Sequence, residues 1–244
     1  MPKPSRTKSS PGQPNWETPG RDNGPAILFD LDGTLLDSSY EHVTAWREAL
    51  RDTGIDIPNA RMHRCVGMSG KVMLRAIFTE LGQRVSPQKI DHLEKLHKEK
   101  FAKKLPFIKV LPGARELLEY RSAAGIRWAI ATSGDQKTVK RMIKPLRIPT
   151  TAPVVTGDHV EHAKPSPDVF LEAAARLGAY LGDCIVVGDS IWDLLAARRA
   201  KALGVGLLCG GYGEAELIQA GAYRVYRDPA DLLKRIAEIG IQPE

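Results

Sequence analysis

The chain has 244 residues, enough for one large α/β domain or a core with a smaller second domain, and its hydrophobic content of 43% is ordinary for a globular protein. No apolar run reaches the roughly 18 residues that a bilayer-spanning helix needs, and no secretory signal is evident, so we expect a cytoplasmic protein without a membrane partner. The net charge of +6 is mixed with acidic residues along stretches such as 94–100, typical of solvated faces, so we expect no nucleic-acid partner.

The first 24 residues differ in composition from the rest of the chain. They are rich in Pro, Ser, Gly and Lys, with one aromatic residue, Trp16. Such a composition cannot bury enough apolar surface to offset the entropy lost on ordering. We therefore predict a flexible tail over residues 1–24.

From residue 26 onward, short apolar runs alternate with helical patterns. Runs without polar alternation suit strands that are buried on both faces. The predicted strands are 26–31, 126–132, 153–156, 184–188, 203–208 and a candidate sixth at 223–226. The predicted helices between them are 113–124, 135–146, 167–177 and 191–202. This alternation predicts an α/β fold with a doubly wound parallel sheet.

One interval interrupts the alternation. Between the first strand and residue 126 the pattern is helical, with helices predicted at 40–53 and 71–81 and another opening at Ser86-Pro87. We predict a small α-helical domain over 38–110, inserted after the first strand, with 25–37 and 111–244 forming the α/β core. Ligands of open α/β sheets bind outside the carboxyl ends of the strands, which is the edge that the insert would cover.

Two carboxylates, Asp30 and Asp32, follow the first predicted strand. Like charges about 4 Å apart repel by roughly 4 kcal/mol at an effective dielectric near 20. A bound cation or a retained proton relieves this repulsion. A cation-bound carboxylate can serve as a nucleophile and a protonated carboxyl as an acid, so the pair indicates chemistry.

The other predicted strands also end in polar residues. Taken singly, each has a simpler structural interpretation: the acids favour turns, the Thr-Ser pair could cap a helix, a loop lysine is usually solvated, and Ser190 with Asp193 resembles a capping box. The residues that follow the second, third and fourth strands are Thr132-Ser133-Gly134, Lys164, and Gly188-Asp189-Ser190 with Asp193.

Together, the four segments resemble the four motifs of the haloacid dehalogenase superfamily of phosphohydrolases. The segments are Asp30-Leu31-Asp32-Gly33-Thr34, Thr132, Lys164-Pro165 and Gly188-Asp189-Ser190-Ile191-Trp192-Asp193, in this order. The resemblance covers about residues 25–230, and the helical insert occupies the position of the family's cap domain.

The resemblance implies a Mg²⁺-dependent phosphatase that forms an aspartyl phosphate. Asp30 would be the nucleophile and a metal ligand, and Asp32 would exchange protons with the leaving oxygen and with water. The Asp32 backbone carbonyl and Asp189 would complete the protein ligands of the metal, with Asp193 supporting them. Thr132 and Lys164 would hold the phosphoryl oxygens. Further substrate-binding residues would be Gly33, Thr34, Ser133 and Gly134.

Asp32 separates this reaction from dehalogenation. Expulsion of a halide needs no proton, and the dehalogenases lack an acid at this position. The resemblance therefore favours cleavage of a phosphate ester.

Two segments of the insert, 37–46 and 64–69, are similar to cap segments of the branch that contains phosphoglycolate phosphatases, sugar phosphatases and β-phosphoglucomutases. His42 and Arg64 would then face the substrate, although a helix-surface histidine and a solvated arginine are equally good interpretations. We expect a small phosphorylated metabolite as substrate and a monomer or weak dimer. The alternatives are a β-phosphoglucomutase-like isomerase and a non-catalytic binding protein.

Overall fold

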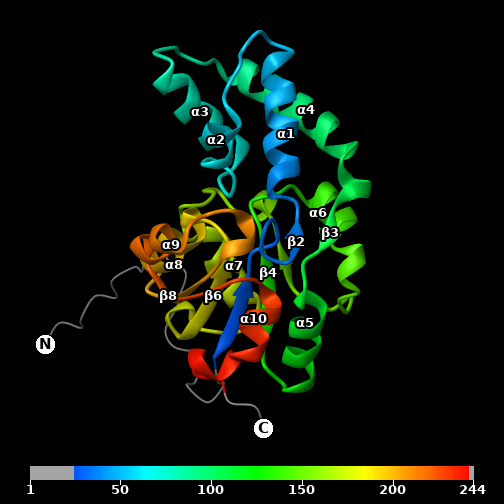
Figure 1. Cartoon of the computed structure of the whole chain (residues 1–244), viewed down its shortest axis with the longest axis vertical. Coiled ribbons are helices and arrows are strands. Elements are labelled where there is room, and N and C mark those ends of the chain that lie inside the picture. Colours follow the sequence, from blue (N-terminus) through cyan, green and yellow to red (C-terminus); the bar gives the residue numbers. More distant parts are fainter. Residues whose placement is uncertain (1–24, 242–244) are drawn as a thin grey trace, which may run out of the picture.

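The computed structural model describes residues 25–241, so the predicted flexible tail at 1–24 lies outside the described residues. An α/β core forms the lower part of the molecule and a group of helices lies above it (Figure 1). Within the described range no helix is long and apolar enough to cross a membrane.

The core is built on a six-stranded parallel sheet with the order β5-β4-β1-β6-β7-β8. The strands are β1 (Ala26–Phe29), β4 (Trp128–Ala131), β5 (Val154–Val155), β6 (Cys184–Gly188), β7 (Leu203–Leu207) and β8 (Ala222–Tyr226). The first strand lies at the centre, with Ile27 opposite Trp128 on one side and Ile185 on the other. The predicted doubly wound sheet and all six predicted strands are therefore confirmed.

Helices cover both faces of the sheet because successive strand residues point to opposite sides. Ile27 and Phe29 pack with α5, α6 and α10, whereas Ala26 and Leu28 pack with α7 and α8. The core helices are α5 (Ala114–Ala123), α6 (Gln136–Met142), α7 (Asp168–Arg176), α8 (Ile191–Arg199), α9 (Glu214–Ala220) and α10 (Pro229–Lys234). The first four were predicted, and the short helices α9 and α10 were not.

The helices above the core have an apolar cluster of their own. They are α1 (Ser39–Arg51), α2 (Asn59–His63), α3 (Gly70–Glu80) and α4 (Pro87–Ala102). Trp46, Leu74, Phe78 and Leu93 are buried in that cluster. Three of these helices were predicted, whereas the five-residue α2 is too short to show a helical period. We call α1–α4 the helical unit.

Two short strands join the helical unit to the core. β2 (Leu36–Asp37) and β3 (Lys109–Val110) pair in antiparallel fashion, with Leu36 opposite Val110. The chain therefore enters and leaves the helical unit at adjacent points. The predicted domain boundaries at residues 38 and 110 lie next to these strands and remain predictions.

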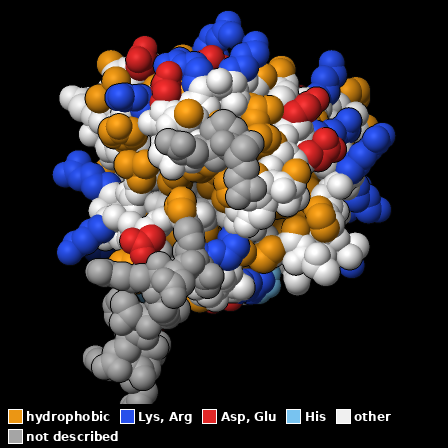
Figure 2. Space-filling view, turned by 90° about the horizontal axis from the view of Figure 1, so that it is seen from below, with side chains coloured by type: hydrophobic (Ala, Val, Ile, Leu, Met, Phe, Trp, Pro, Cys, Tyr) orange, Lys and Arg blue, Asp and Glu red, His pale blue; other side chains and the backbone are white. Residues whose placement is uncertain are grey.

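The lower end of the core carries charge of both signs. Figure 2 shows Lys and Arg side chains at the edge of this face, interspersed with Asp and Glu and with apolar side chains between them. The positive charge is dispersed on this face, and the prediction of no nucleic-acid partner remains a prediction.

Candidate active site

The predicted site residues meet at the carboxyl edge of the sheet, below the helical unit. Asp30 follows β1, Thr132 follows β4 and Asp189 follows β6. The Asp30 backbone N–H donates to the Val187 carbonyl at 2.9 Å, so the backbone of the neighbouring strands fixes the position of Asp30. The structure thus brings together residues that are up to 163 positions apart, from Asp30 to Asp193.

Lys164 is the buried cation of this edge. Its side chain is 0% exposed, and its Nζ forms ion pairs with Asp30 and, at 2.7 Å, with Asp193. Burial lowers the pKa of Lys164, but the two carboxylates raise it further, so the net pKa lies above its ordinary value. Lys164 is therefore a fixed positive charge that holds Asp30 from behind.

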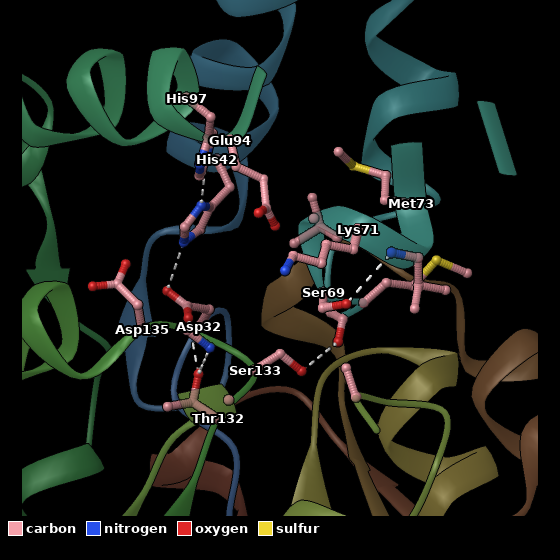
Figure 3. Close-up of a pocket in the computed structure, with 18 of the residues that line it drawn as sticks. Asp32, His42, Ser69, Lys71, Met73, Glu94, His97, Thr132, Ser133 and Asp135 are labelled. Carbon is pink, nitrogen blue, oxygen red and sulfur yellow. Dashed lines mark hydrogen bonds and ion pairs between the residues drawn. The ribbon is translucent and has the colours of Figure 1, made fainter. Parts of the chain in front are cut away.

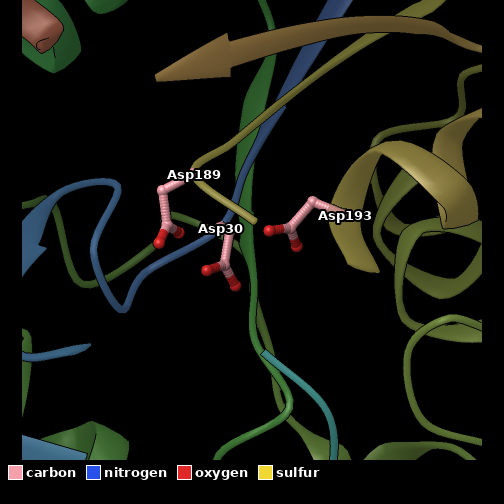
Figure 4. A group of neighbouring side chains, drawn as sticks. All are labelled: Asp30, Asp189 and Asp193. Carbon is pink, nitrogen blue, oxygen red and sulfur yellow. The ribbon is translucent and has the colours of Figure 1, made fainter. Parts of the chain in front are cut away.

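Three buried carboxylates surround one point of the site. One oxygen each from Asp30, Asp189 and Asp193 lies within 4.8 Å of the others (Figure 4). Burial, partly opposed by Lys164, raises the pKa of Asp30 to about 7. Burial and the neighbouring Asp193 and Asp30 raise the pKa of Asp189 well above its ordinary value.

The charge of this group fits a divalent cation. When all three carboxylates are ionised, the single positive charge of Lys164 leaves an excess of negative charge in a buried place. Hard oxygen ligands are those that Mg²⁺ prefers. The Asp32 side chain is not a member of this group, and the predicted role of its backbone carbonyl as a ligand remains a prediction.

Two glycines leave room for the Asp189 carboxylate. A Cβ on Gly210 would lie 1.7 Å from Asp189 Oδ2, and a Cβ on Gly33, whose φ is +78°, would lie 2.3 Å from the same atom. Thr34 donates to Asp189 Oδ1 at 3.0 Å. Gly33 and Thr34, which we predicted to bind substrate, thus contact Asp189 and do not line the cavity described below.

The Asp32 side chain points toward His42 of the helical unit (Figure 3). Its Oδ1 accepts from Ser38 Oγ at 2.5 Å and lies 3.2 Å from His42 Nε2, and its Oδ2 lies 3.5 Å from Thr132 Oγ1. Burial raises the pKa of Asp32, but the charge and hydrogen bond of His42 and the hydrogen bond from Ser38 lower it below its ordinary value. These contacts favour the ionised form of Asp32.

A second histidine extends this chain of contacts. His42 Nδ1 lies 3.2 Å from His97 Nε2, and the His97 ring stacks on Trp46 with centroids 3.9 Å apart. Burial, together with His42, lowers the pKa of His97 well below its ordinary value. Neutral His97 can accept a hydrogen bond from His42 while His42 donates to Asp32.

A cavity of about 680 Å³ lies between the core and the helical unit. Of the predicted residues it is lined by Asp30, Asp32, Thr132, Ser133, Gly134 and His42. Lys164, Asp189 and Asp193 lie beneath this surface. The hydroxyl of Ser133 donates to the Gly67 carbonyl of the helical unit at 3.1 Å.

The helical unit contributes lining residues that sequence reasoning did not identify. They are Ser69, Lys71, Glu94, His97 and Lys98, among others. Glu94, His97 and Lys98 belong to the stretch of alternating charge that we interpreted as a solvated face. The helical period of α4 could have shown which of its residues face inward. It could not have shown which residues of other elements they contact.

The structure does not place Arg64 among the lining residues of the cavity. Its guanidinium pairs with Glu216 at 2.7 Å and lies over the Tyr212 ring, and its carbonyl accepts from Trp192 Nε1 at 3.1 Å. The loop after α2 therefore rests on the core beside α8 and α9. The expectation that Arg64 faces the substrate remains a prediction.

Comparisons with known proteins agree with this geometry. A model of the haloacid dehalogenase-like hydrolase family matches residues 25–201, which contain all the strand-end residues described above. Hexitol phosphatase A of Escherichia coli (strain K12) is 33% identical over 177 residues, 71% of this chain and 78% of that protein. A phosphoglycolate phosphatase of Xanthomonas campestris is 29% identical over 187 residues, 76% of this chain and 83% of that protein. The crystal structure of a hydrolase from Pseudomonas syringae is similar with a TM-score of 0.86 at 46% identity, covering 88% of this chain and 99% of that one.

Proposed function

Because the chain belongs to the haloacid dehalogenase-like hydrolase family, we propose that it is a Mg²⁺-dependent phosphatase that hydrolyses a small phosphorylated metabolite through a phosphorylated Asp30. The predicted family and the predicted class of enzyme, a phosphoric monoester hydrolase, are confirmed by the family match and the phosphatase relatives. The substrate, the metal and the intermediate are the proposal.

The observation that carries the proposal is the arrangement of Asp30. Its carboxylate lies on the floor of the cavity, paired with buried Lys164 and next to Asp189 and Asp193. We propose that an oxygen of Asp30 attacks phosphorus and that the bond between phosphorus and the ester oxygen breaks. Water then attacks phosphorus of the aspartyl phosphate, which releases phosphate and restores Asp30.

Asp32 supplies and removes the protons in this proposal. The Asp32–His42 pair donates a proton to the departing ester oxygen, and Asp32 later accepts a proton from the attacking water. Support comes from the position of Asp32, which lines the cavity next to Asp30 and touches both His42 and Thr132. The proton requirement is also what distinguishes ester cleavage from dehalogenation.

The metal proposal rests on the buried carboxylates. Asp30, Asp189 and the Asp32 backbone carbonyl would hold Mg²⁺, with Asp193 beside them, and the bound ion would neutralise negative charge on the phosphoryl oxygens. Lys164 acts by fixing Asp30 and Asp193, because its side chain is enclosed between them. Thr132, Ser133 and Gly134 would border the transferred phosphoryl group, where Thr132 Oγ1 already accepts from the Gly134 N–H at 3.0 Å.

The helical unit would act as a cap over the reaction. We propose that it excludes water during phosphoryl transfer and opens for release of the product. The hydrogen bond from Ser133 to Gly67 and the Asp32–His42 contact both join it to the core beside the site.

The test is the release of p-nitrophenolate from p-nitrophenyl phosphate, with Mg²⁺ and with chelator. We expect turnover that requires the metal and is abolished in Asp30→Asn, while Asp183→Asn, an exposed acid of the core, serves as the matched control. Absence of turnover by the wild type would contradict the phosphatase proposal. Equal turnover by Asp30→Asn would contradict only the assignment of the nucleophile.

The alternative reaction, isomerisation as by a β-phosphoglucomutase, needs a second measurement. The enzyme would be given β-glucose 1-phosphate, and glucose 6-phosphate and free phosphate would be followed together. We expect phosphate to form faster. Faster formation of glucose 6-phosphate would make isomerisation the main reaction.

A further inference from the structure

The part of the cavity away from Asp30 and Asp32 has a nearly balanced charge. Its cationic lining residues are Lys71, Arg75 and Lys98. Its acidic lining residues are Glu94, Asp135, Asp158 and Glu161. A distal carboxylate or second phosphate of a substrate would therefore meet at least as much negative as positive charge.

Several of these charged side chains already contact other groups of the protein. Lys98 lies 3.7 Å from Asp135, an ion pair that joins α4 to the start of α6. Asp158 accepts from the Gln136 backbone N–H at 2.7 Å. Lys98 and Asp135 therefore already neutralise each other, whereas Asp158 keeps its negative charge.

Lys71 and Glu94 are lining charges on two helices of the helical unit that lie near each other without forming an ion pair. Lys71 is at the start of α3 and Glu94 is in the middle of α4. Figure 3 shows both side chains projecting into the space that Asp32 borders from the core side. Within residues 25–241 neither forms an ion pair, with the other or with a third residue.

Glu94 lies close to the start of α3. A Cβ on Gly70 would lie 2.9 Å from Glu94 Oε1. The glycine thus allows the first turn of α3 to approach Glu94 closely. The half-buried Glu94 carboxylate keeps acceptor capacity toward the cavity, since an ionised carboxylate has about four lone-pair sites.

We propose, resting on the phosphatase function above, that the substrate beyond the transferred phosphate is an uncharged, polyhydroxylated carbon chain whose hydroxyl groups bind Glu94 and Lys71. A hydroxyl can donate to the Glu94 carboxylate and accept from the Lys71 ammonium, so one polyol satisfies both charges. A carboxylate at the same place is repelled by Glu94. The two-carbon phosphoglycolate is therefore a poor fit and a sugar or sugar-alcohol phosphate a good one.

The size of the cavity points the same way. Cavities of about 300–1,000 Å³ enclose ligands well above two carbons in length. The volume of about 680 Å³ exceeds what a two-carbon acid phosphate would fill. A six-carbon chain attached to a phosphate at Asp30 would extend toward α3 and α4, where Lys71 and Glu94 lie.

The experiment compares kcat/KM for sorbitol 6-phosphate and for phosphoglycolate, with p-nitrophenyl phosphate measured alongside, in saturating Mg²⁺. We expect the wild type to favour sorbitol 6-phosphate at least tenfold. In Glu94→Gln this preference should fall at least tenfold, because one charge-assisted hydrogen bond is lost and the repulsion of phosphoglycolate is relieved. Lys71→Met should lower kcat/KM for sorbitol 6-phosphate by a similar factor.

Matched controls lie on the outer side of α4. Glu99→Gln and Lys95→Met remove the same charges at exposed positions that do not line the cavity, and the preference should not change. Thermal unfolding of Glu94→Gln tests whether loss of its contact with α3 disturbs the fold, and Lys71→Met keeps the test decisive if it does.

The outcomes separate the two proposals. Turnover of p-nitrophenyl phosphate together with a wild-type preference for phosphoglycolate, or a preference that survives both Glu94→Gln and Lys71→Met, would overturn the polyol inference and leave the phosphatase intact. Absence of Mg²⁺-dependent phosphate release from all three compounds would overturn the phosphatase and the inference together.

Discussion

The carboxyl edge of the sheet and the facing surface of the helical unit use charge in different ways. At the sheet edge, Lys164 and Asp193 have side chains that are 0% exposed and pair with each other at 2.7 Å. On the facing surface, Lys71 is exposed and Glu94 half-buried, with no ion pair between them. The comparison teaches that the core holds its charges in buried pairs, while the helical unit keeps Lys71 and Glu94 unpaired at the cavity.

Because the two regions differ in burial, substitutions in them should differ in how much folding stability they remove. Removing one member of a buried ion pair leaves an uncompensated charge and costs about 3–5 kcal/mol of stability. Exposed pairs contribute about 0–1 kcal/mol. Substitutions at the sheet edge should therefore affect stability and rate together, and substitutions on the helical unit should affect selectivity first.

The largest effect is expected for Lys164→Met. It would leave Asp30 and Asp193 without their cation and lower the free energy of unfolding by about 3–5 kcal/mol. We expect kcat with p-nitrophenyl phosphate to fall by about 10²–10³-fold, as for loss of one preorganised electrostatic contact. Lys140→Met, at an exposed position of α6, is the control, and a loss of less than tenfold at Lys164 would show that the sheet edge does not depend on its buried cation.

Removal of the metal should make the same edge sensitive to pH. The pKa of Asp30 is raised to about 7 and that of Asp189 is also raised, so the folded protein binds more protons than the unfolded chain between about pH 4 and 7. The metal-free protein should therefore lose stability as the pH rises through this window. Mg²⁺ should add about 2.7 kcal/mol at a hundredfold excess over its Kd. At a fixed Mg²⁺ concentration the stabilisation should be larger at pH 8 than at pH 5, because protons compete with the metal for the carboxylates.

Asp189→Asn sharpens this expectation. Without the Asp189 carboxylate, thermal unfolding should respond weakly to Mg²⁺ and less steeply to pH, whereas Asp183→Asn should behave as the wild type. An equal Mg²⁺-induced shift in Tm for Asp189→Asn would remove Asp189 from the metal site.

A smaller effect is expected where the two regions meet, at His97→Phe. The change keeps the stacking on Trp46 but removes the contact with His42, which holds Asp32. We expect about a tenfold loss of kcat for an alkyl phosphate, whose leaving oxygen needs a proton. Little loss is expected for p-nitrophenyl phosphate, whose phenolate leaves unprotonated.

His92→Phe, at an exposed position of α4, is the matched control for this split. Equal losses for both compounds in His97→Phe would indicate a general disturbance of the helical unit instead of an effect on proton transfer.

The smallest effect is expected for Arg64→Ala. Its guanidinium pairs with Glu216 at an exposed position, away from the cavity. Stability should change by less than about 1 kcal/mol, and kcat/KM for any phosphorylated substrate by less than about twofold. A tenfold rise in KM would restore Arg64 to the substrate site and blur the distinction between the two regions.

The residues of the sheet edge could be predicted because the apolar run that marks a strand also locates the polar residue at its carboxyl end. An apolar run identifies a strand, and the polar residue that follows it lies at the carboxyl edge, so Asp30, Thr132 and Asp189 are predicted to lie together. The fully buried runs of β1, β4 and β6 explain why these strands were predicted, whereas the five-residue α2 is too short to carry a periodic signal.

The cavity-lining residues of the helical unit could not be predicted, because no single sequence signal marks both the helix and its cavity-facing side. The packing of α4 against α1 and α3 decides which side chains of α4 face the cavity. The sequence of a charged stretch such as 94–100 does not predict that packing. Glu94 and His97 were therefore not predicted as lining residues, and Arg64, which was expected at the substrate, does not line the cavity. The two-residue strands β2 and β3 were missed because their pairing is between distant parts of the chain.

The adjacent crossings at β2 and β3 have a consequence for how such proteins diversify. Since Leu36 and Val110 lie opposite each other in one ladder, the chain between them leaves the core and returns to it at adjacent points. A different insert could be spliced in there without altering the connections of the six-stranded sheet. Recombination at these two neighbouring points would then exchange the helical unit, and with it the proposed substrate preference. The residues at the carboxyl edge of the sheet would stay unchanged.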